Sequence, residues 1–358
     1  MMYVIWTAIA GVLAAILLYI DYLLNSMKEI DRMEFEGKLY LRPSIVQLLS
    51  NLNKSDIMRP KKVYRVTYDN GFELLLPRRE WAVAAKEALT LDYQSDDIIV
   101  SSFPKSGTTW IQEITWLICN NSDTVAAKKC PLQNRFPFLE MASLSNNSAL
   151  GIKILEKWPK NKQRLIKTHL PFETLPIAFQ TGKCKVIYVA RNPKDVCVSL
   201  YYFGIINTAV PHPGNWSTFL ASYCSGEIIY GSWFPHVKGY WKKFQENRSW
   251  IYFTTYEELT KDLRGQIISI SKFLEKNLTD PQIDVIAKHC TFESMSKNKS
   301  TNYSHLTDRG PGFKNAKFMR KGKVGDWKNY FTLNQNEAFD NLYEENMRDN
   351  GLDFKFEL

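Results

Sequence analysis

Residues 98–110 read IIVSSFPKSGTTW, and this stretch decides the fold. Its first residues are apolar and β-branched and predict a buried strand, while the residues after the loop begin an apolar helical pattern. Between them lies a loop of small residues with one lysine, Lys105. Such a loop can turn backbone N–H groups and hydroxyls toward an anion, with the positive end of the helix dipole behind them. The stretch therefore predicts an α/β fold with an anion site between a strand and a helix.

The order of residues in this loop separates it from the Walker A loop. Walker A needs Gly-x-x-x-x-Gly-Lys-Ser/Thr, whereas Lys105 precedes Gly107 in this chain. No strand ending in an aspartate is evident for a magnesium ion, so a P-loop kinase or NTPase is disfavoured. An ordinary polar turn would still explain Ser-Gly-Thr by itself. Three further segments argue against that simpler interpretation.

The first segment, residues 185–203, reads KVIYVARNPKDVCVSLYYF and holds a second junction between a strand and a helix. The strand pattern stops at Arg191, and the helical pattern begins at Asn192-Pro193. Open α/β sheets bind ligands at the carboxyl ends of their strands, so Arg191 is a candidate anion ligand. Ser199 follows roughly two helical turns later and could approach the same anion.

The other two segments add charge and an ionisable pair. Residues 318–329, FMRKGKVGDWKN, form a basic loop punctuated by glycine. Arg320 offers a guanidinium fork, Lys321 a point charge and Gly322 a backbone N–H, which suits a second phosphate. Residues 166–171, IKTHLP, are a short apolar approach that carries Lys167 and His169 before a proline. The chain thus offers two anion sites and a candidate base.

Together these motifs resemble the cytosolic-type sulfotransferase family. PKSGTTW, KTHLP, RNPKDVxVSxYYF and RKGxxGDWKNxFT occur in the family's order and spacing over roughly residues 60–358, as do PFLE at 137–140 and GSWFPHV at 231–237. The resemblance implies one P-loop-like α/β domain with a central parallel sheet flanked by helices. It also implies transfer of a sulfuryl group from 3′-phosphoadenosine 5′-phosphosulfate to a hydroxyl of a small lipophilic alcohol or phenol of steroid, retinoid or phenolic type.

The resemblance further implies a donor site with two halves. The 5′-phosphosulfate would lie in the loop of Lys105, Ser106, Gly107, Thr108 and Thr109. The 3′-phosphate side would be formed by Arg191, Ser199, Phe318, Met319, Arg320, Lys321 and Gly322. Trp110 and Phe292 would sandwich the adenine, with Tyr256 and Thr291 at its edge. Cys290 stands where the family more often has a hydroxyl residue, so one donor contact there is in doubt.

The implied chemistry is an in-line displacement driven by positioning and by cations at the leaving oxygen. His169 would take the proton of the acceptor hydroxyl, because its pKa lies near neutrality. Lys105 would stabilise charge on the bridging oxygen, and Lys167 would assist at the sulfuryl oxygens, with Ser199 counted among the catalytic groups. No divalent metal is required. A lone histidine is more often structural, so the role of His169 depends on the KTHLP context.

The acceptor pocket is less legible than the donor site. Phe138 and Phe203 match family positions that line an apolar acceptor cavity, and the aromatic surroundings suit a flat or lipophilic hydroxyl compound. Aromatic clusters usually belong to the hydrophobic core, which is the alternative interpretation of these residues.

An alternative function for the whole chain is a catalytically silent, membrane-tethered nucleotide-binding protein, which would keep the phosphate sites and lose the base. The presence of Lys105, His169 and Ser199 favours the enzyme.

Composition agrees with a globular enzyme. The chain has 358 residues, 45% of them hydrophobic, and a net charge of +9. The basic residues are spread out and form no stripe with interleaved aromatics, so a nucleic-acid partner is not expected. The six cysteines include no C-x-x-C pair and no matching histidines for zinc, so we expect reduced, packed thiols and no metal site.

The amino-terminal segment departs from the soluble family pattern. The segment from Met2 to Ile20 carries no charge, and its length matches the ~20 residues that a helix needs to cross a bilayer core. Residues 1–24 are therefore predicted as a transmembrane anchor. A buried core helix is the alternative, and a cleaved signal peptide is disfavoured because no basic n-region precedes the segment. Lys28, Arg32 and Lys38 follow it, which places the catalytic domain on the cytosolic side. A soluble cytoplasmic protein remains the alternative localisation.

Beyond the anchor, residues 25–62 are predicted as a linker and residues 63–358 as the sulfotransferase domain. Within that domain, residues 63–68 form a strand pattern with a hairpin turn at Asn70-Gly71. Helical patterns cover residues 109–119, 215–225, 234–244, 263–273, 282–288 and 336–349, and their alternation with strands favours a parallel sheet. Residues 328–337 resemble the family's short dimerisation motif, with Leu333 in place of valine, so we predict a homodimer.

Overall fold

The computed structural model describes residues 63–142, 150–304 and 317–358. The predicted anchor at residues 1–24 and the linker at residues 25–62 lie outside these ranges. In the part of the chain that the structure describes, no helix combines the length and the apolar character needed to cross a membrane.

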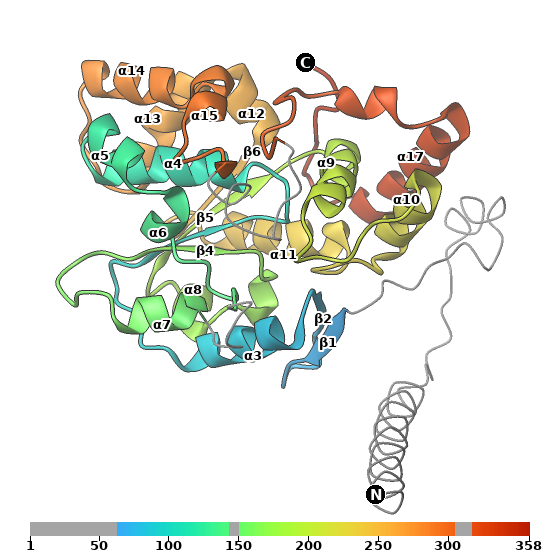
Figure 1. The fold of residues 1–358 in the computed structure, drawn as a ribbon, viewed down its shortest axis with the longest axis horizontal. Coiled ribbons are helices and arrows are strands. Elements are labelled where there is room, and N and C mark those ends of the chain that lie inside the picture. Colours follow the sequence, from blue (N-terminus) through green and yellow to red (C-terminus); the bar gives the residue numbers. More distant parts are fainter. Residues whose placement is uncertain (1–62, 143–149, 305–316) are drawn as a thin grey trace, which may run out of the picture. The chain divides into compact units, whose positions relative to one another are not determined.

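A parallel sheet of four strands organises the described residues (Figure 1). Its strands are β3 (Ile98–Ser101), β4 (Leu165–Thr168), β5 (Lys185–Ala190) and β6 (Ile251–Thr255). They pair in the order β4–β3–β5–β6, and every pairing is parallel. The strands are rich in Val and Ile and almost wholly buried, as expected for a parallel sheet covered on both faces. The predicted parallel α/β architecture is therefore confirmed.

The register brings the carboxyl ends of the four strands to one edge of the sheet. Ser101 of β3 pairs with Thr168 of β4 and with Tyr188 of β5, and Ala190 of β5 pairs with Thr255 of β6. The chain leaves β3 toward β4 on one side, while β5 lies on the other side. In open α/β sheets such a reversal creates a crevice outside the strand ends. The residues that follow these four strand ends form the site.

One face of the sheet carries a large apolar core. Ile98 and Val100 of β3 and Ile187 and Val189 of β5 point to this face, because alternate residues of a strand share a side. The helices gathered around this core are α4 (Thr108–Cys119), α5 (Thr124–Lys129), α6 (Leu132–Arg135), α12 (Tyr256–Lys261), α13 (Leu263–Phe273), α14 (Asp280–His289) and α15 (Phe292–Lys297) (Figure 1). Helix α4 begins directly at the predicted anion loop, so the core anchors the loop from behind.

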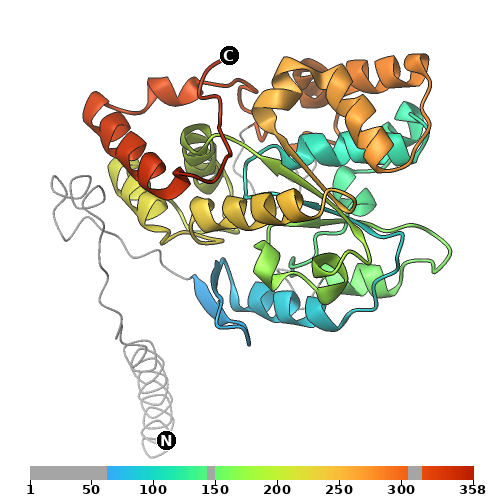
Figure 2. The same cartoon turned by 180° about the vertical axis from the view of Figure 1, so that it is seen from behind.

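The opposite face of the sheet packs against helix α11 (Trp233–Glu246) (Figure 2). Tyr188 of β5 stacks on Tyr240 of α11 with ring centroids 4.0 Å apart. The Ser101 hydroxyl donates a hydrogen bond of 2.8 Å to the Tyr240 hydroxyl. The short helices that come before β5 in the sequence, apart from those around the apolar core, are α3 (Arg79–Glu87), η2 (Ala88–Thr90), α7 (Leu150–Glu156), η3 (Phe172–Thr174) and α8 (Ile177–Gln180). Both faces are thus covered, as the sequence predicts.

A two-stranded hairpin precedes the main sheet. Strands β1 (Tyr64–Thr67) and β2 (Glu73–Leu76) pair in antiparallel register. The Asn70 side chain accepts a hydrogen bond of 3.0 Å from the Phe72 N–H, and Gly71 has a left-handed φ of +77°. Such a turn needs the residue types that Asn70-Gly71 supplies, so the predicted hairpin is confirmed.

The remaining helices form the carboxyl-terminal part of the fold. They are α9 (Pro193–Ile206), α10 (Trp216–Ser225), η4 (Asp326–Asn329) and α17 (Leu333–Met347). Helix α9 begins as predicted, because the Asn192 side chain accepts a hydrogen bond from the Asp195 N–H and a proline follows it. Helix α17 begins three residues earlier than predicted, because Thr332 and Gln335 form a capping box there. The helical patterns locate the helices correctly, and the caps set their ends.

Candidate active site

The anion loop after β3 needs unusual backbone conformations. Lys105 has a φ of +71° and Gly107 a φ of +104°, and Gly107 is the N-cap of α4. A Cβ atom on Gly107 would lie 2.9 Å from Cδ2 of Tyr256. Only glycine combines this φ with so close an approach. The glycine in the motif is therefore required by both conformation and space.

The same loop presents unused polar groups. The first N–H groups of a helix have no partner within the helix, and here they belong to the residues that follow Gly107. The Ser106 hydroxyl is buried and has no hydrogen-bond partner among the described residues. The Thr108 hydroxyl lies 2.6 Å from the Ser102 hydroxyl, which fixes its position. An anion would satisfy the orphaned donors and the helix dipole together.

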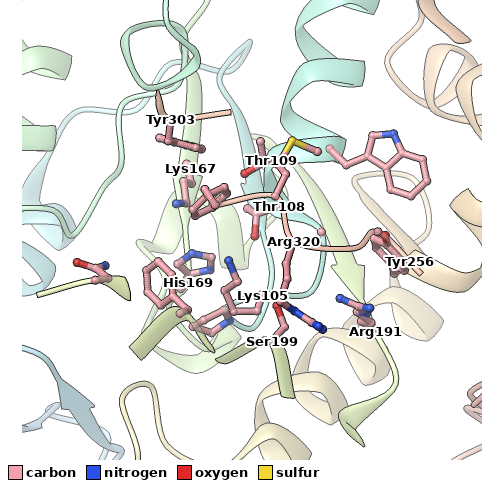
Figure 3. Close-up of a pocket in the computed structure, with 18 of the residues that line it drawn as sticks. Lys105, Thr108, Thr109, Lys167, His169, Arg191, Ser199, Tyr256, Tyr303 and Arg320 are labelled. Atoms are coloured by element: carbon pink, nitrogen blue, oxygen red, sulfur yellow. The ribbon is translucent and has the colours of Figure 1, made fainter. Parts of the chain in front are cut away.

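A cavity of about 850 Å³ opens beside this loop. Figure 3 shows Lys105, Lys167 and His169 directed into the same space, with Arg191, Ser199 and Arg320 further along it. The predicted site residues that line the cavity are Lys105, Gly107, Thr108, Thr109, Trp110, Phe138, Lys167, His169, Arg191, Ser199, Phe203, Tyr256, Phe292, Phe318, Met319, Arg320, Lys321 and Gly322. Residues from 105 to 322 in the sequence therefore meet in one place.

Two predicted donor residues do not line the cavity. Ser106 is fully buried beneath the loop, and its backbone N–H donates to the Phe103 carbonyl at 3.2 Å. Thr291 is exposed and caps α15, where its hydroxyl accepts from the Ser294 N–H at 3.2 Å and donates to the Lys288 carbonyl at 3.2 Å. The Thr291 hydroxyl is thus already used by the helix end.

His169 follows the end of β4 in a defined tautomer. Its Nδ1 lies 2.7 Å from the Ser102 carbonyl oxygen, which only accepts hydrogen bonds. Nδ1 therefore carries the proton, and Nε2 is left with a lone pair. Nε2 has no hydrogen-bond partner among the described residues, and the ring lines the cavity. Burial, reinforced by Lys167, holds the pKa of His169 well below its usual value, so the imidazole is neutral.

A buried carboxylate, Glu140, holds the backbone around His169. Its Oε1 accepts from the His169 N–H at 2.7 Å and from the Tyr230 hydroxyl at 3.1 Å. Its Oε2 accepts from the Thr168 hydroxyl at 2.8 Å. Burial raises the pKa of Glu140, while the nearby Lys167 and these hydrogen bonds act against the rise. Glu140 comes from the PFLE motif, and its contacts account for a glutamate in that motif.

A second buried chain of hydrogen bonds supports the same segment. The Tyr188 hydroxyl donates to Nδ1 of His236 at 2.9 Å, and Nε2 of His236 donates to the His169 carbonyl at 2.9 Å. Burial lowers the pKa of His236 to about 4, so this histidine is neutral. His236 belongs to the GSWFPHV motif. The motif thus contributes to the site by fixing the peptide of His169 from β5 and α11.

The two lysines of the site lie against aromatic rings. Nζ of Lys105 is 4.0 Å from the centroid of Phe318 and 4.6 Å from that of Phe203. Nζ of Lys167 is 4.0 Å from the centroid of Phe138. Burial, followed by the charges of Lys167, Arg191 and Arg320, lowers the pKa of Lys105 to about 7. Burial likewise lowers the pKa of Lys167. The site therefore concentrates positive charge, which an anion would stabilise.

Arg191 lies at the carboxyl end of β5. Its guanidinium carbon is 4.2 Å from the ring centroid of Tyr256, and Nη2 donates to the Lys323 carbonyl at 2.9 Å. Nε is buried and has no hydrogen-bond partner among the described residues. The arginine is thus held in place with one donor unused.

The basic loop, residues 318–329, brings two further cations to Arg191. Asp326 pairs with Arg320 at 2.6 Å and with Lys321 at 2.7 Å. Gly322 has a φ of +66°, and a Cβ atom there would lie 2.1 Å from Cδ2 of Phe292. The backbone of the loop therefore packs directly on an aromatic ring at Gly322, and a side chain at this position would clash with that ring.

The apolar part of the cavity includes residues that the sequence analysis missed. Trp81 of α3 contacts Phe138 edge to face at 5.4 Å, and Phe138 contacts the His169 ring at 5.2 Å. Met141, Val210, Ile229, Tyr230 and Tyr303 also line the cavity. No motif or periodicity marks these residues, because they come from separate loops and helices. Tyr230 carries one signal, its position beside the GSWFPHV motif.

The described residues hold no obvious metal site. Within residues 63–142, 150–304 and 317–358, no group of three or more His, Cys, Asp or Glu side chains could hold a metal ion. The six cysteines are free thiols, and Cys184, Cys197, Cys224 and Cys290 are buried. Cys290 is the one of these that lines the cavity.

Comparison with known proteins identifies this site. A model of the family described as "Sulfotransferase domain" matches residues 95–351, well over half of the chain. The chain belongs to the cytosolic-type sulfotransferase family. Dog sulfotransferase 1B1 is 44% identical to this sulfotransferase over 263 residues, which is 74% of this chain and 87% of the dog protein. Human sulfotransferase 1E1 is 41% identical with the same coverage of both chains.

Solved structures share the fold of this sulfotransferase. Retinol dehydratase in complex with retinol and PAP has a TM-score of 0.74 and 26% sequence identity, covering 88% of this chain and 97% of that one. Mouse sulfotransferase SULT7A1 complexed with PAP has a TM-score of 0.61 and 29% identity, covering 80% of this chain and 94% of that one. The protein is a sulfotransferase of the type that uses 3′-phosphoadenosine 5′-phosphosulfate as sulfuryl donor.

The residues of the cavity fit this donor. A nucleotide with phosphates at two positions needs two groups of anion ligands, and the cavity is lined by Lys105 and the start of α4 in one place and by Arg191, Arg320 and Lys321 in another. Arg191 Nε, which is buried without a hydrogen-bond partner among the described residues, is the kind of donor that a phosphate oxygen satisfies. Aromatic rings, including Trp110, Tyr256 and Phe292, line the same cavity and offer surfaces for a base.

Proposed function

We propose that this sulfotransferase sulfates the hydroxyl of a small lipophilic alcohol or phenol, with His169 as general base. One observation carries the proposal: the open Nε2 of a neutral His169 lies in a cavity whose one part is cationic and whose other part is aromatic. The cationic part suits the donor and the aromatic part suits the acceptor, and His169 lines the same cavity as both.

The donor would be held by the residues at the strand ends. Lys105, Ser106, Gly107, Thr108 and Thr109 bind the 5′-phosphosulfate, and Arg191, Ser199, Arg320, Lys321 and Gly322 bind the 3′-phosphate, flanked by Phe318 and Met319. Trp110 and Phe292 enclose the adenine, with Tyr256 at its edge. Thr291 would lie near the adenine edge without using its hydroxyl there, because that hydroxyl caps α15. When bound, the donor supplies the sulfuryl group that is transferred.

The chain's own groups divide the chemistry among them. His169 Nε2 accepts the proton of the acceptor hydroxyl, while the Ser102 carbonyl and Glu140 hold the ring and backbone of His169 in place. Lys105 provides positive charge at the bridging oxygen that leaves with the nucleotide, and the anionic donor beside it favours the protonated form of this lysine. Lys167 offsets charge on the sulfuryl oxygens, and Ser199 orients the donor from α9. The enclosing rings exclude water.

The acceptor class follows from the other part of the cavity. Phe138, Phe203, Trp81, Met141 and Tyr230 line it, and aromatic side chains favour flat or lipophilic partners. Solved structures of retinol dehydratase contain retinol or androsterone, both apolar molecules with one hydroxyl. We therefore favour steroid, retinoid or phenolic acceptors for this chain.

Two further features belong to the same proposal. Residues 1–24 would anchor the enzyme in a membrane with the catalytic domain in the cytosol, which would bring the cavity near lipid-dissolved acceptors. Deleting residues 1–24 should lower turnover of a membrane-embedded alcohol and leave turnover of a water-soluble phenol unchanged. Equal rates on both acceptors before and after deletion would refute the anchor.

The enzyme would also form a homodimer through residues 328–337. Leu333, at the start of α17 and within this motif, has 72% of its surface exposed and is therefore available for a contact with a second copy. Leu333→Asp should convert dimer to monomer in multi-angle light scattering. A wild-type enzyme that is strictly monomeric at micromolar concentration would contradict this part of the proposal.

The main test compares sulfate transfer by the wild type, His169→Ala and a control, His212→Ala. His212 is exposed and does not line the cavity, so its loss should not affect the rate. Labelled donor is offered with a panel of phenols, steroids, retinoids and fatty alcohols. We expect turnover on at least one lipophilic class, lowered by about 10²–10⁴-fold in His169→Ala, the usual contribution of a general base. Turnover that survives in His169→Ala would overturn the role of His169.

The second candidate function, a silent nucleotide-binding protein, makes a different prediction. It would bind PAP and transfer no sulfate from the donor to any acceptor of the panel. The neutral His169 with an open Nε2 favours the enzyme over this alternative.

A further inference from the structure

We infer that Asp195 is a positioning residue that fixes the basic loop against the start of α9 and thereby sets the affinity for the donor's 3′-phosphate. The inference rests on the proposed placement of that phosphate between Arg191 and the basic loop. Asp195 does not line the cavity, and no role for it follows from the motif reading.

The carboxylate of Asp195 binds the end of the basic loop directly. Asp195 is 1% exposed. Its Oδ2 accepts from the Gly325 N–H at 2.9 Å, and its Oδ1 accepts from the Trp327 N–H at 3.0 Å. These bonds join residues 130 and 132 positions apart in the sequence. Hydrogen bonds to a buried carboxylate are short and strong, so the junction is well defined.

The same carboxylate is fixed on the strand side. Asn192 Nδ2 donates to Asp195 Oδ2 at 2.9 Å, and the Asp195 N–H donates to Asn192 Oδ1 at 2.8 Å. Asn192 in turn donates its backbone N–H and its side-chain amide to Glu257 Oε1 at 2.9 and 3.0 Å. Asp195 is thus tied to the ends of both β5 and β6. It can serve as a fixed point for the loop.

All three cations proposed for the 3′-phosphate are linked to this point. Arg191 Nη2 lies 3.5 Å from Asp195 Oδ2 and also donates to the Lys323 carbonyl at 2.9 Å. Arg320 and Lys321 form ion pairs with Asp326. Asp326 lies in the sequence between Gly325 and Trp327, whose N–H groups donate to Asp195. Asp195 therefore sets the distance between the arginine at the strand end and the two cations of the loop. A phosphate is bound tightly only when these groups converge.

Replacing Asp195 by asparagine should disturb this convergence selectively. The volume is unchanged, but one carboxylate oxygen becomes an NH₂ group. That group would face an N–H donor in either orientation, because both oxygens of Asp195 accept from the loop. One hydrogen bond to the loop is lost and a donor faces a donor. The loop after β3, 90 residues earlier in the chain, shares no hydrogen bond with Asp195 among the described residues and should be unaffected.

The test measures binding of PAP and of adenosine 5′-phosphate, which lacks the 3′-phosphate, by calorimetry on the full chain. Wild type should prefer PAP strongly. Asp195→Asn should weaken PAP binding by at least tenfold and change binding of adenosine 5′-phosphate by less than twofold. Asp340→Asn is the matched control, because Asp340 pairs with Lys194, the neighbour of Asp195, and ties α9 to α17 instead of to the basic loop. The control should keep the preference for PAP.

Each result separates one cause from another. If wild type shows no preference for PAP, the proposed 3′-phosphate site is wrong and the inference falls with it. If wild type prefers PAP and Asp195→Asn keeps that preference, the inference alone is wrong. An equal loss for both nucleotides in Asp195→Asn, or the same selective loss in Asp340→Asn, would mean a general effect on the fold and would also overturn it.

Hydrogen exchange on ligand-free wild type provides a test that needs no variant. The Gly325 and Trp327 amides donate to Asp195 and should exchange slowly before any nucleotide is added. Protection that appears only on addition of PAP would show that the ligand, and not Asp195, orders the loop.

Discussion

The cationic and the aromatic parts of the cavity are built in different ways. The cationic part combines residues at strand ends, such as the loop after β3 and Arg191 after β5, with Arg320 and Lys321 of one short basic motif. The aromatic part takes Trp81 from α3, Phe138 from a loop, and Tyr303 from beyond α15. Anion binding depends on local backbone conformation, whereas the acceptor space depends on where distant elements pack. Short sequence motifs can therefore reveal candidate anion-binding residues, but they cannot reveal the residues that line the aromatic part of the cavity.

The backbone at the cationic part shows how local this dependence is. Lys105 and Gly107 have positive φ, and so does Gly322 in the basic loop. These conformations cost energy for any side chain, and glycine is the residue that bears the cost best. The described aromatic residues of the cavity show no such requirement, except Tyr230 and Tyr303, whose φ values are +66° and +57°. Changes at the two parts should therefore have separable effects.

The largest effect is expected from Lys105→Met. Removing the cation at the leaving oxygen should lower kcat by about 10²–10³-fold, the usual loss when one charge-stabilising group is removed. Single-turnover sulfate transfer with saturating donor measures this loss apart from binding. Lys272→Met, at an exposed position of α13 outside the cavity, should keep the wild-type rate. A loss below threefold in Lys105→Met would place the catalytic charge elsewhere.

Gly322→Ala should weaken PAP binding by at least tenfold and leave the acceptor KM unchanged. The new methyl group would meet the Phe292 ring at 2.1 Å, so the loop or the ring must move. Gly71→Ala is the matched control, because its φ of +77° imposes similar strain while nothing lies within 4 Å of the new atom. Both variants should lose roughly 1–2 kcal/mol of stability from the left-handed backbone. Equal PAP affinity in the two would contradict the close contact.

The third prediction concerns pH. Lys105 has a pKa of about 7 in the free protein, and an anionic nucleotide beside it should raise that pKa. Binding then takes up a proton above pH 7, so PAP affinity should fall as pH rises from 7, by up to about tenfold per unit. Calorimetry in buffers of different ionisation enthalpy measures the proton uptake directly. Lys105→Met should abolish most of it, and an uptake that stays the same in this variant would assign it to another group.

The smallest effect is expected at the aromatic part. Trp81→Leu removes the edge-to-face contact with Phe138 and some apolar surface, so the KM of a lipophilic acceptor should rise about three- to tenfold, or about 1 kcal/mol. PAP affinity should be unchanged, since the ring of Trp81 contacts Phe138, which is not among the residues proposed to hold the donor. A change in PAP affinity as large as that in acceptor KM would mean that the two parts are not independent.

Much of the fold could be predicted from patterns in the sequence. The buried strands at residues 98–101 and 185–190, the hairpin at Asn70-Gly71 and the helices after Gly107 and Asn192 lie where expected. Helix ends were less accurate where a capping box decided them, as at Thr279 and Thr332. Short helices such as α7 and α8 were missed, because a few residues carry too little periodicity to stand out.

The candidate site was predicted unevenly for the same physical reason. Lys105, His169 and Arg191 follow strand ends, and the parallel register brings those ends together. Thr291 is predicted at the adenine edge, and the structure shows that its hydroxyl also caps α15, since a threonine before a helix is drawn to its free N–H groups. The supports Tyr188 and His236 could not be assigned a role, because hydrogen bonds between distant segments leave no pattern in the sequence.

The sequence by itself determined the α/β class and marked the two motifs proposed to bind anions and the histidine proposed as base, because each depends on a few neighbouring residues and on backbone conformations that glycine and proline reveal. Only the tertiary structure decided the His169 tautomer, the carboxylates that hold the surrounding backbone and the aromatic walls of the cavity. These arise from contacts between residues far apart in the sequence, such as Asp195 and Trp327, which are 132 positions apart. Such contacts depend on how whole elements pack, which no short stretch of sequence specifies.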